Sequence, residues 1–169
     1  MTRDVQKNKM IIRAAAPVDL DVICAFIAEL AAHEGRPELA TITPDILQGL
    51  LFGDRALANA FLGYVKGQCA AYAIVAERFS SFRGTRLLYV EDMLVRPEFR
   101  GDGTGKQFLA FLAKRAAAKG CERMEWSALD NNDVALGFYD HIGAERESGV
   151  VHFSLRGEQF DNLIRSGDG

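Results

Sequence analysis

Three strand-like segments follow one another in the middle of this 169-residue chain, and that succession limits the folds open to it. Residues 61–66 and 69–77 are largely apolar and meet at Lys66-Gly67-Gln68, which is typical of a hairpin turn. A loop over residues 79–84 leads to the third strand, Thr85–Val95. Doubly wound parallel sheets alternate strands with helices, so three strands in a row indicate a mixed sheet instead.

Helical patterns flank these strands on both sides. Pro17 opens the first, in which apolar residues recur at helical spacing as far as Ala31. Thr43-Pro44-Asp45 opens the second with a capping hydroxyl, an early proline and an early acid. A third helix runs from a glycine-rich loop to about Lys119, and Asp133–His141 forms a fourth.

Three more strands complete the predicted sheet, at residues 10–15, 122–128 and 150–156. The expected order is β-α-α-β-β-β-α-β-α-β, a mixed central sheet flanked by helices, which is an α/β fold. We expect one domain over residues 10–165, with flexible tails at 1–9 and 166–169. A hydrophobic content of 49% is enough for a sizeable core without support from metal or disulfides.

Charge, cysteines and hydropathy exclude several classes of protein. The net charge is −3, which disfavours binding of nucleic acid through bulk positive charge. Cys24, Cys69 and Cys121 are odd in number and lack C-x-x-C spacing, which favours three small buried side chains over a disulfide or a zinc site. No apolar run reaches the ~20 residues of a membrane helix, and residues 1–9 lack the apolar stretch of a signal peptide. We therefore expect a cytoplasmic protein with no metal, nucleic-acid or membrane partner.

A glycine-rich loop follows the third central strand and precedes a helix. Its sequence is Arg100-Gly101-Asp102-Gly103-Thr104-Gly105-Lys106, with glycine at alternate positions. Glycines let backbone amides approach a ligand, and a helix N-terminus attracts anions, to which Arg100 and Lys106 add positive charge. The spacing fits neither G-x-x-x-x-G-K-[ST] nor G-x-G-x-x-G. The loop is predicted to bind an anion, and a flexible surface turn is the alternative.

Two adjacent carboxylates interrupt the apolar strand Thr85–Val95. Side-chain alternation places Glu91 and Asp92 on opposite faces of the sheet. A carboxylate in a buried strand is unfavourable unless it is paired or used, and a low dielectric raises its pKa toward the range of a general base. A cationic substrate would lower that pKa instead, so both acids are candidate functional residues. The alternatives are an exposed strand position and a buried ion pair.

Two motifs resemble those of the GNAT acetyltransferase superfamily. The R-x-x-G-x-G spacing of the glycine loop is similar to the pyrophosphate-binding motif of that family, whose ligand is acetyl-CoA. Asn132-x-x-Ala135-x-x-Phe138-Tyr139 resembles a second motif, in which the asparagine contacts the pantetheine arm and the tyrosine protonates the departing thiolate. A core aromatic residue is the alternative reading of Tyr139. The resemblance implies the GNAT fold and these cofactor contacts: Met93, Leu94, Val95, Arg100, Gly101, Asp102, Gly103, Thr104, Gly105, Lys106, Asn132 and Ala135.

Within that superfamily, the sequence Leu-Leu-Tyr-Val-Glu-Asp at residues 87–92 is similar to the spermidine/spermine and thialysine acetyltransferase branch. Glu29-Leu30-Ala31 and Glu34 match the E-L-A-x-x-E pattern of the same branch, while His33 replaces a common aromatic residue. The resemblance implies a site for a cationic amine with these substrate contacts: His33, Glu34, Glu91, Asp92 and Trp126. It also implies a homodimer, with residues 150–156 at the contact.

The expected reaction is direct transfer of an acetyl group from acetyl-CoA to a primary amine of a small cationic substrate, such as a polyamine, a diamine or a thialysine-like amino acid. Glu91 would act as the base, directly or through water, because such an amine is mostly protonated at neutral pH. A backbone N–H near Leu94 and Val95 would donate to the developing oxyanion, and Tyr139 would act as the acid. Two alternatives stay open: acetylation of a protein N-terminus or lysine, and a non-catalytic acyl-CoA-binding sensor.

Overall fold

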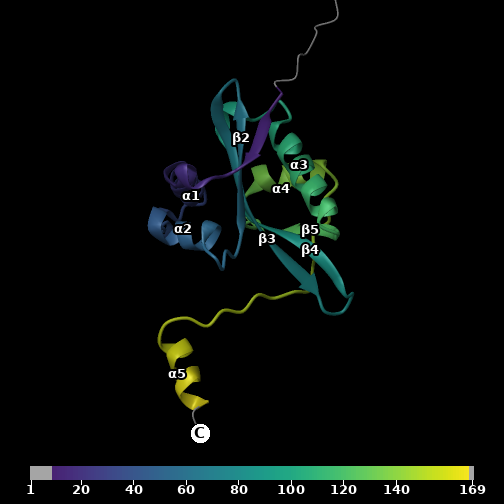
Figure 1. The fold of residues 1–169 in the computed structure, drawn as a ribbon. Coiled ribbons are helices and arrows are strands. Elements are labelled where there is room, and N and C mark those ends of the chain that lie inside the picture. Colours follow the sequence, from purple (N-terminus) through teal and green to yellow (C-terminus); the bar gives the residue numbers. More distant parts are fainter. Residues whose placement is uncertain (1–8, 168–169) are drawn as a thin grey trace, which may run out of the picture. The chain divides into compact units, whose positions relative to one another are not determined.

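A computed structural model describes residues 9–167 (Figure 1). The chain divides into two compact units, the first ending at Leu136 and the second beginning at Gly137. The first unit contains the sheet, and the boundary falls inside a helix. The proposed tail over residues 1–9 lies outside the described residues except for Lys9, as do the last two residues of the chain.

Five strands form one sheet over the described residues, in the order β1-β2-β3-β4-β5. The first four pair antiparallel, and β4 pairs parallel with β5, so the predicted mixed α/β sheet is confirmed. The strands are β1 (Ile11–Ala14), β2 (Asn59–Val65), β3 (Gln68–Ser80), β4 (Thr85–Val95) and β5 (Cys121–Trp126). Parallel neighbours need a crossover between them, and the helix that follows β4 provides it.

Helices cover both faces of this sheet (Figure 1). Over the described residues the α-helices are α1 (Leu20–His33), α2 (Pro44–Phe52), α3 (Thr104–Ala118), α4 (Asp133–His141) and α5 (Glu158–Ser166), with short 3₁₀ turns at Pro17–Asp19, Pro37–Leu39 and Pro97–Phe99. The predicted cap of α2 is present, since the Thr43 hydroxyl accepts from the Ile46 amide at 3.4 Å. None of the described helices is long and apolar enough to cross a membrane.

The main core lies between the sheet and the pair α1 and α2. Ile23 and Phe26 of α1 are fully buried there against Tyr72 of β3, and Leu47 of α2 joins them. On the opposite face α3 buries Phe108 and Leu112, and Phe111 of this helix meets Phe61 edge-on with ring centroids 5.3 Å apart. Ile23 of α1 and Phe108 and Leu112 of α3 belong to the apolar stripes that the sequence predicted, whereas Phe26 was not part of the predicted stripe of α1.

The hairpin between β2 and β3 turns where it was predicted. Lys66 and Gly67 both have positive φ, 50° and 80°, as a two-residue turn between twisted strands requires. The predicted loop over residues 79–84 is too long, however. Phe79 and Ser80 continue β3 and pair with Arg86 and Thr85, because β4 extends far enough to satisfy their backbone groups.

The strand predicted at residues 150–156 is wrong. These residues adopt no regular element in the structure, and a helix that was not predicted, α5, follows them. Apolar residues alternate in the segment, but within the described chain no strand pairs with it, and Phe153 is 92% exposed. Alternation favours a strand only where a neighbour supplies hydrogen bonds. Ser166, which was expected to begin a flexible tail, is the last residue of α5.

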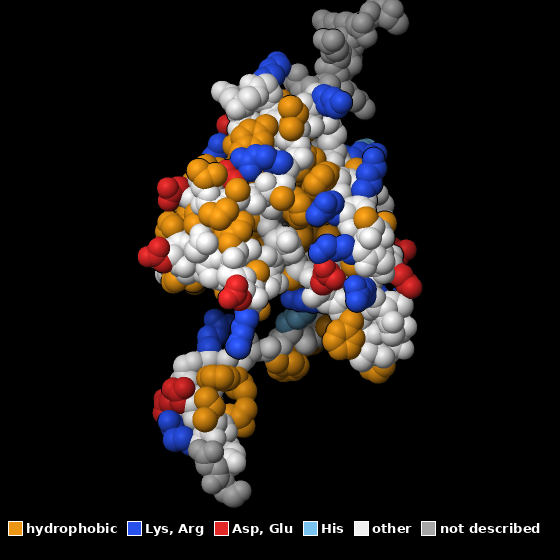
Figure 2. Space-filling model, viewed as in Figure 1, with side chains coloured by type: hydrophobic (Ala, Val, Ile, Leu, Met, Phe, Trp, Pro, Cys, Tyr) orange, Lys and Arg blue, Asp and Glu red, His pale blue; other side chains and the backbone are white. Residues whose placement is uncertain are grey.

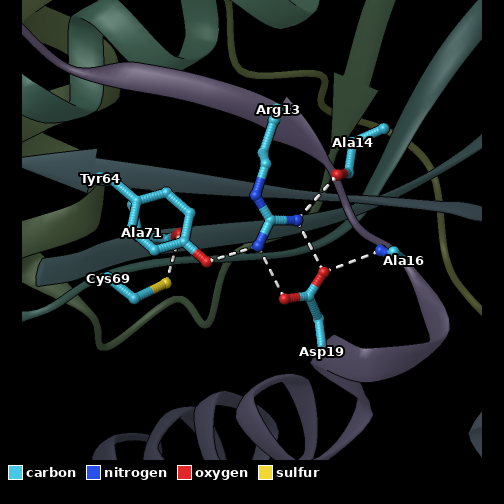
Figure 3. Close-up of polar contacts among 7 residues, drawn as sticks. All are labelled: Arg13, Ala14, Ala16, Asp19, Tyr64, Cys69 and Ala71. Atoms are coloured by element: carbon cyan, nitrogen blue, oxygen red, sulfur yellow. Dashed lines mark hydrogen bonds and ion pairs between the residues drawn. The ribbon is translucent and has the colours of Figure 1, made fainter. Parts of the chain in front are cut away.

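A half-buried ion pair ties β1 to the start of α1 (Figure 3). Arg13 donates to both carboxylate oxygens of Asp19, at 2.6 and 2.7 Å, and to the Tyr64 hydroxyl at 2.7 Å. Asp19 also accepts from the Ala16 amide at 2.8 Å and is itself buried. The hydrogen bond from Arg13 holds the pKa of Asp19 below its usual value, and burial opposes that shift.

We expect Asp19→Asn to lower the free energy of unfolding by about 2 kcal/mol at pH 7, because Arg13 loses its charged acceptor. The Arg13 side chain is 44% exposed, which keeps the loss below that of a fully buried pair. Because the pKa of Asp19 is lowered, the stabilisation is complete above about pH 4 and is lost as the pH falls through the lowered pKa. Urea denaturation at a series of pH values measures both effects.

Asp21→Asn is the matched control, since Asp21 lies in the first turn of α1 and is exposed. Its effect should stay within about 0.5 kcal/mol, as for most surface changes. Equal losses in the two variants would show that the Arg13–Asp19 pair does not stabilise the fold.

Candidate active site

The strand β4 is paired differently in its two halves. Its parallel ladder with β5 runs from Arg86 to Val90 and ends opposite Trp126. Beyond Val90 the strand continues to Val95 and pairs with β3 alone. Among the described residues, no strand pairs with the other edge of β4 over this second half. The backbone groups on that edge can therefore contact a ligand.

The hydrogen bonds around Val95 show which amides face the open edge. The Arg96 amide donates to the carbonyl oxygen of Ala70 at 2.9 Å, so Arg96 faces β3. Backbone directions alternate along an antiparallel strand, which places the Leu94 N–H toward β3 and the Val95 N–H toward the open edge. The Val95 carbonyl agrees, because it accepts from Arg100 Nε at 2.7 Å on that edge. Of the two amides proposed from the sequence, that of Val95 points outward.

The glycine loop joins this edge to α3. Gly101 and Gly103 have φ values of 89° and 79°, in the left-handed region that favours glycine, and a side chain at either position would meet open space within 4 Å. Gly103 stands before the first turn of α3, where no described side chain caps the helix. The amides of that turn are thus available to an anion. Lys106 and Asp102 are exposed, whereas Thr104 is buried.

A β-bulge separates the two acidic residues of β4. Val90 pairs with Val75 and Asp92 pairs with Ile74, so Glu91 is the extra residue between them. Glu91 is exposed, and its carboxylate lies 3.8 Å from the Arg78 guanidinium. Arg78 in turn covers the Tyr89 ring, at 3.4 Å from the ring centroid. The strand is therefore exposed at Glu91, as one of the sequence alternatives proposed.

Asp92 is in a different environment from its neighbour. It is half-buried on the sheet face that carries Leu94 and Tyr72. Side-chain alternation predicted that Leu88 shares this face as well, which is wrong: the bulge shifts the register, and Leu88 pairs with Glu77 on the opposite face. Burial raises the pKa of Asp92, the nearby charges of Glu91 and Glu34 raise it further, and the Tyr72 hydroxyl opposes the shift. Glu34 caps the C-terminal end of α1. Three carboxylates thus gather where α1 ends beside the middle of β4.

Arg96 connects α1 to the end of β4. It donates to both carboxylate oxygens of Glu29, at 2.6 and 2.9 Å, and to the carbonyl oxygen of Cys69 at 3.0 Å. Its guanidinium also lies over the Phe26 ring, 4.2 Å from the centroid. Sequence reasoning missed this link: it used Glu29 only as part of a motif and gave Arg96 no role.

The remaining predicted residues lie on other elements. Asn132 precedes α4, and its side-chain oxygen accepts from the Ala135 amide at 3.1 Å, which caps that helix. Tyr139 is four residues after Ala135 on α4, belongs to the second unit, is half-buried and has its ring 5.4 Å from that of Phe138.

Two predicted substrate contacts stand at the ends of elements. Trp126 is the last residue of β5 and is half-buried, and His33 is the exposed last residue of α1. The structure brings Asp92, Glu34 and Glu91 together, whereas His33 makes no described contact with them. Over residues 9–167, no three His, Cys, Asp or Glu side chains gather closely enough to hold a metal ion.

Residues 25–144 match the acetyltransferase (GNAT) family model. The chain belongs to the GNAT acetyltransferase family. The thialysine N-ε-acetyltransferase of Bos taurus is 30% identical over 165 residues, which cover 91% of this chain and 96% of the relative. An L-ornithine N5-acetyltransferase of Arabidopsis thaliana is 34% identical over 76 residues, which cover 45% of this chain and 33% of the relative. The suspected resemblance to the thialysine branch is thereby confirmed.

A solved aminoglycoside N-acetyltransferase in complex with CoA shares the fold, with a TM-score of 0.69 and 20% identity over 88% of this chain and 96% of that one. The GNAT protein described here is thus an acetyl-CoA-dependent N-acetyltransferase. Its residues fit such a ligand, because the uncapped turn of α3 offers amides to a diphosphate and the open edge of β4 offers Val95 N–H.

We expect Gly103→Val to weaken acetyl-CoA binding at least tenfold, because a residue with a β-carbon rarely adopts φ near 79° and would displace the loop amides. Isothermal titration calorimetry with acetyl-CoA measures the affinity. Gly84→Val is the matched control: Gly84 also has positive φ and open space around it, and it lies in the turn before β4. Both variants should lose similar stability, and equal affinities would rule out the loop as the anion site.

Proposed function

We propose that this GNAT enzyme acetylates a primary amine of a small cationic molecule, such as a polyamine, a diamine or a thialysine-like amino acid. The observation that supports this proposal most directly is the convergence of Glu34, Glu91 and Asp92 beside the open half of β4. Burial and the charges of Glu91 and Glu34 raise the pKa of Asp92, and a bound cation would stabilise its ionised form. The named activities of the bovine and plant relatives, on thialysine and ornithine, agree with an amine of this kind.

The chemistry assigned to these residues follows from the charge of the substrate. An alkyl ammonium must lose a proton before it can attack, and exposed Glu91 is the proposed base, directly or through water. Acetyl-CoA supplies the acetyl group as a thioester. Val95 N–H, on the open edge, is proposed to donate to the acetyl oxygen as negative charge develops there.

The second motif supplies the remaining proposed roles. The oxygen of Asn132 is committed to capping α4, so its NH₂ group is the part proposed to donate to the pantetheine arm. Tyr139 is proposed to give its proton to the departing thiolate, because a phenol is a suitable acid for a thiolate at neutral pH.

A panel of amines tests the proposal. Acetyl-CoA turnover is measured with thialysine, L-ornithine, spermidine and 1,3-diaminopropane, together with an aminoglycoside and a peptide bearing a free N-terminus and one lysine. The proposal expects a higher kcat/KM for at least one of the first four than for the other two. Turnover confined to the peptide would instead support the protein acetyltransferase alternative.

Two variants test the roles of the acid and the base. Tyr139→Phe and Glu91→Gln should each lower kcat at neutral pH by about 100-fold, the lower range for general acid–base catalysis, while acetyl-CoA affinity stays within a few fold. Glu122→Gln, on the exposed start of β5, is the carboxylate control and should leave kcat unchanged. A variant with unchanged kcat would remove that residue from the mechanism.

We also propose a cytoplasmic homodimer that assembles through the C-terminal segment. Figure 2 shows apolar side chains gathered on one side of α5. Seven apolar residues of this segment are more than half exposed: Val150, Val151, Phe153, Leu155, Phe160, Leu163 and Ile164. An apolar surface of this extent is typical of a protein interface. Phe160→Asp should therefore shift the sedimentation coefficient from dimer to monomer, and a monomeric wild-type enzyme would contradict the proposal.

A further inference from the structure

The side chain of Tyr72 poses a problem that packing alone does not explain. Tyr72 is fully buried in the middle of β3, and its ring stacks on Phe26 with centroids 5.0 Å apart. Within the described part of the chain, no group forms a hydrogen bond with its hydroxyl. A buried hydroxyl without a partner is destabilising, whereas phenylalanine would keep the same stacking.

The surroundings of that hydroxyl are acidic. Tyr72 pairs with Leu94, and Asp92 is the next residue on the same face of β4, so Tyr72 and Asp92 are diagonal neighbours. Burial raises the pKa of Tyr72, and the charges of Asp92, Glu34 and Glu29 raise it further. The phenol therefore keeps its proton and can only be a donor toward these carboxylates.

Asp92 needs a partner for a related reason. It is half-buried and lies beside the like charges of Glu91 and Glu34, which disfavour its ionised form. The Tyr72 hydroxyl is the nearby group that favours the ionised form, and a cation would favour it too. The Tyr72 hydroxyl, which lacks a hydrogen-bond partner within the described residues, and the Asp92 carboxylate, which lacks a counter-ion there, thus lie next to each other.

We propose that Tyr72 is a positioning residue for the substrate amine: its hydroxyl donates to one oxygen of Asp92 and turns the other oxygen toward an N–H of the substrate ammonium. This inference rests on the proposed function, since it presumes a cationic amine. It adds a residue that no motif identifies, and it assigns recognition of the cation to Asp92 rather than to exposed Glu91. A quaternary ammonium has no N–H and would lack this hydrogen bond.

Tyr72→Phe tests the proposal with little change of shape. The KM for thialysine should rise about tenfold while kcat changes less than twofold, because a hydrogen bond to a charged group is lost in the bound state. Since the hydroxyl favours ionised Asp92, its loss raises the pKa of Asp92. The acidic limb of the kcat/KM profile should therefore move to higher pH. A purely structural tyrosine would move neither quantity.

Tyr64→Phe is the matched control, because the Tyr64 hydroxyl accepts from Arg13 in the ion-pair network of Figure 3. It should lower the unfolding midpoint in urea and leave the KM and the pH profile unchanged. Tyr72→Phe should show the opposite pattern, with a changed KM and pH profile and an unfolding midpoint close to that of wild type, because phenylalanine keeps the buried ring and its stacking on Phe26.

A double-mutant cycle with Asp92→Asn decides whether Tyr72 acts through Asp92. In the Asp92→Asn background, Tyr72→Phe should add no further change in KM. Equal tenfold effects in both backgrounds, or a Tyr72→Phe enzyme with the wild-type KM and pH profile, would overturn the inference and leave the proposed function standing. A wild-type enzyme that acetylates none of the small amines would instead overturn the proposed function, and this inference with it.

Discussion

The active-site side of this protein depends on one constraint, the change of pairing along β4. The strand has neighbours on both edges as far as Val90 and on one edge afterwards, because β5 ends at Trp126. An unpaired strand edge normally invites association with another strand. Here the edge is short and leads through the 3₁₀ turn Pro97–Phe99 into the glycine loop and α3, so the outward amide of Val95 and the uncapped amides of α3 lie at the two ends of one connection.

The bulge at Glu91 places the two neighbouring acidic residues in different environments. Without the extra residue, the register between β3 and β4 would have to continue unbroken past Val90. With it, one carboxylate reaches solvent beside Arg78, and the other enters the face covered by α1 and α2. A half-buried aspartate without a counter-ion lowers the stability of the fold, so other contacts must stabilise it. The Arg13–Asp19 pair fixes the start of α1 to the sheet, and the Arg96–Glu29 pair fixes a later turn of the same helix.

The sequence determines those elements whose signals are local. Thr85–Val95 and Asp133–His141 were predicted with their observed bounds, because Gly84 and Pro97 flank the apolar run and Asn132 and Gly143 flank the helical pattern. Residues 150–156 were mistaken for a strand, since alternation carries no information on whether a neighbour exists. Tyr72 escaped notice for the same reason: it reads as one more aromatic residue in a strand until the register places it beside Asp92.

The site requires groups of opposite charge to lie close together without neutralising one another. The amides of α3 and the guanidinium of Arg100 are proposed to bind an anion, whereas Asp92 and Glu34 are proposed to bind a cation. Arg100 is kept from the carboxylates because it is bonded to the Val95 carbonyl on the open edge. The Asp92 side chain projects instead from the face that packs against α1 and α2. The backbone groups of a strand point along the sheet, whereas its side chains point perpendicular to it. The strand β4 can therefore offer backbone donors to the proposed anion and a carboxylate to the proposed cation.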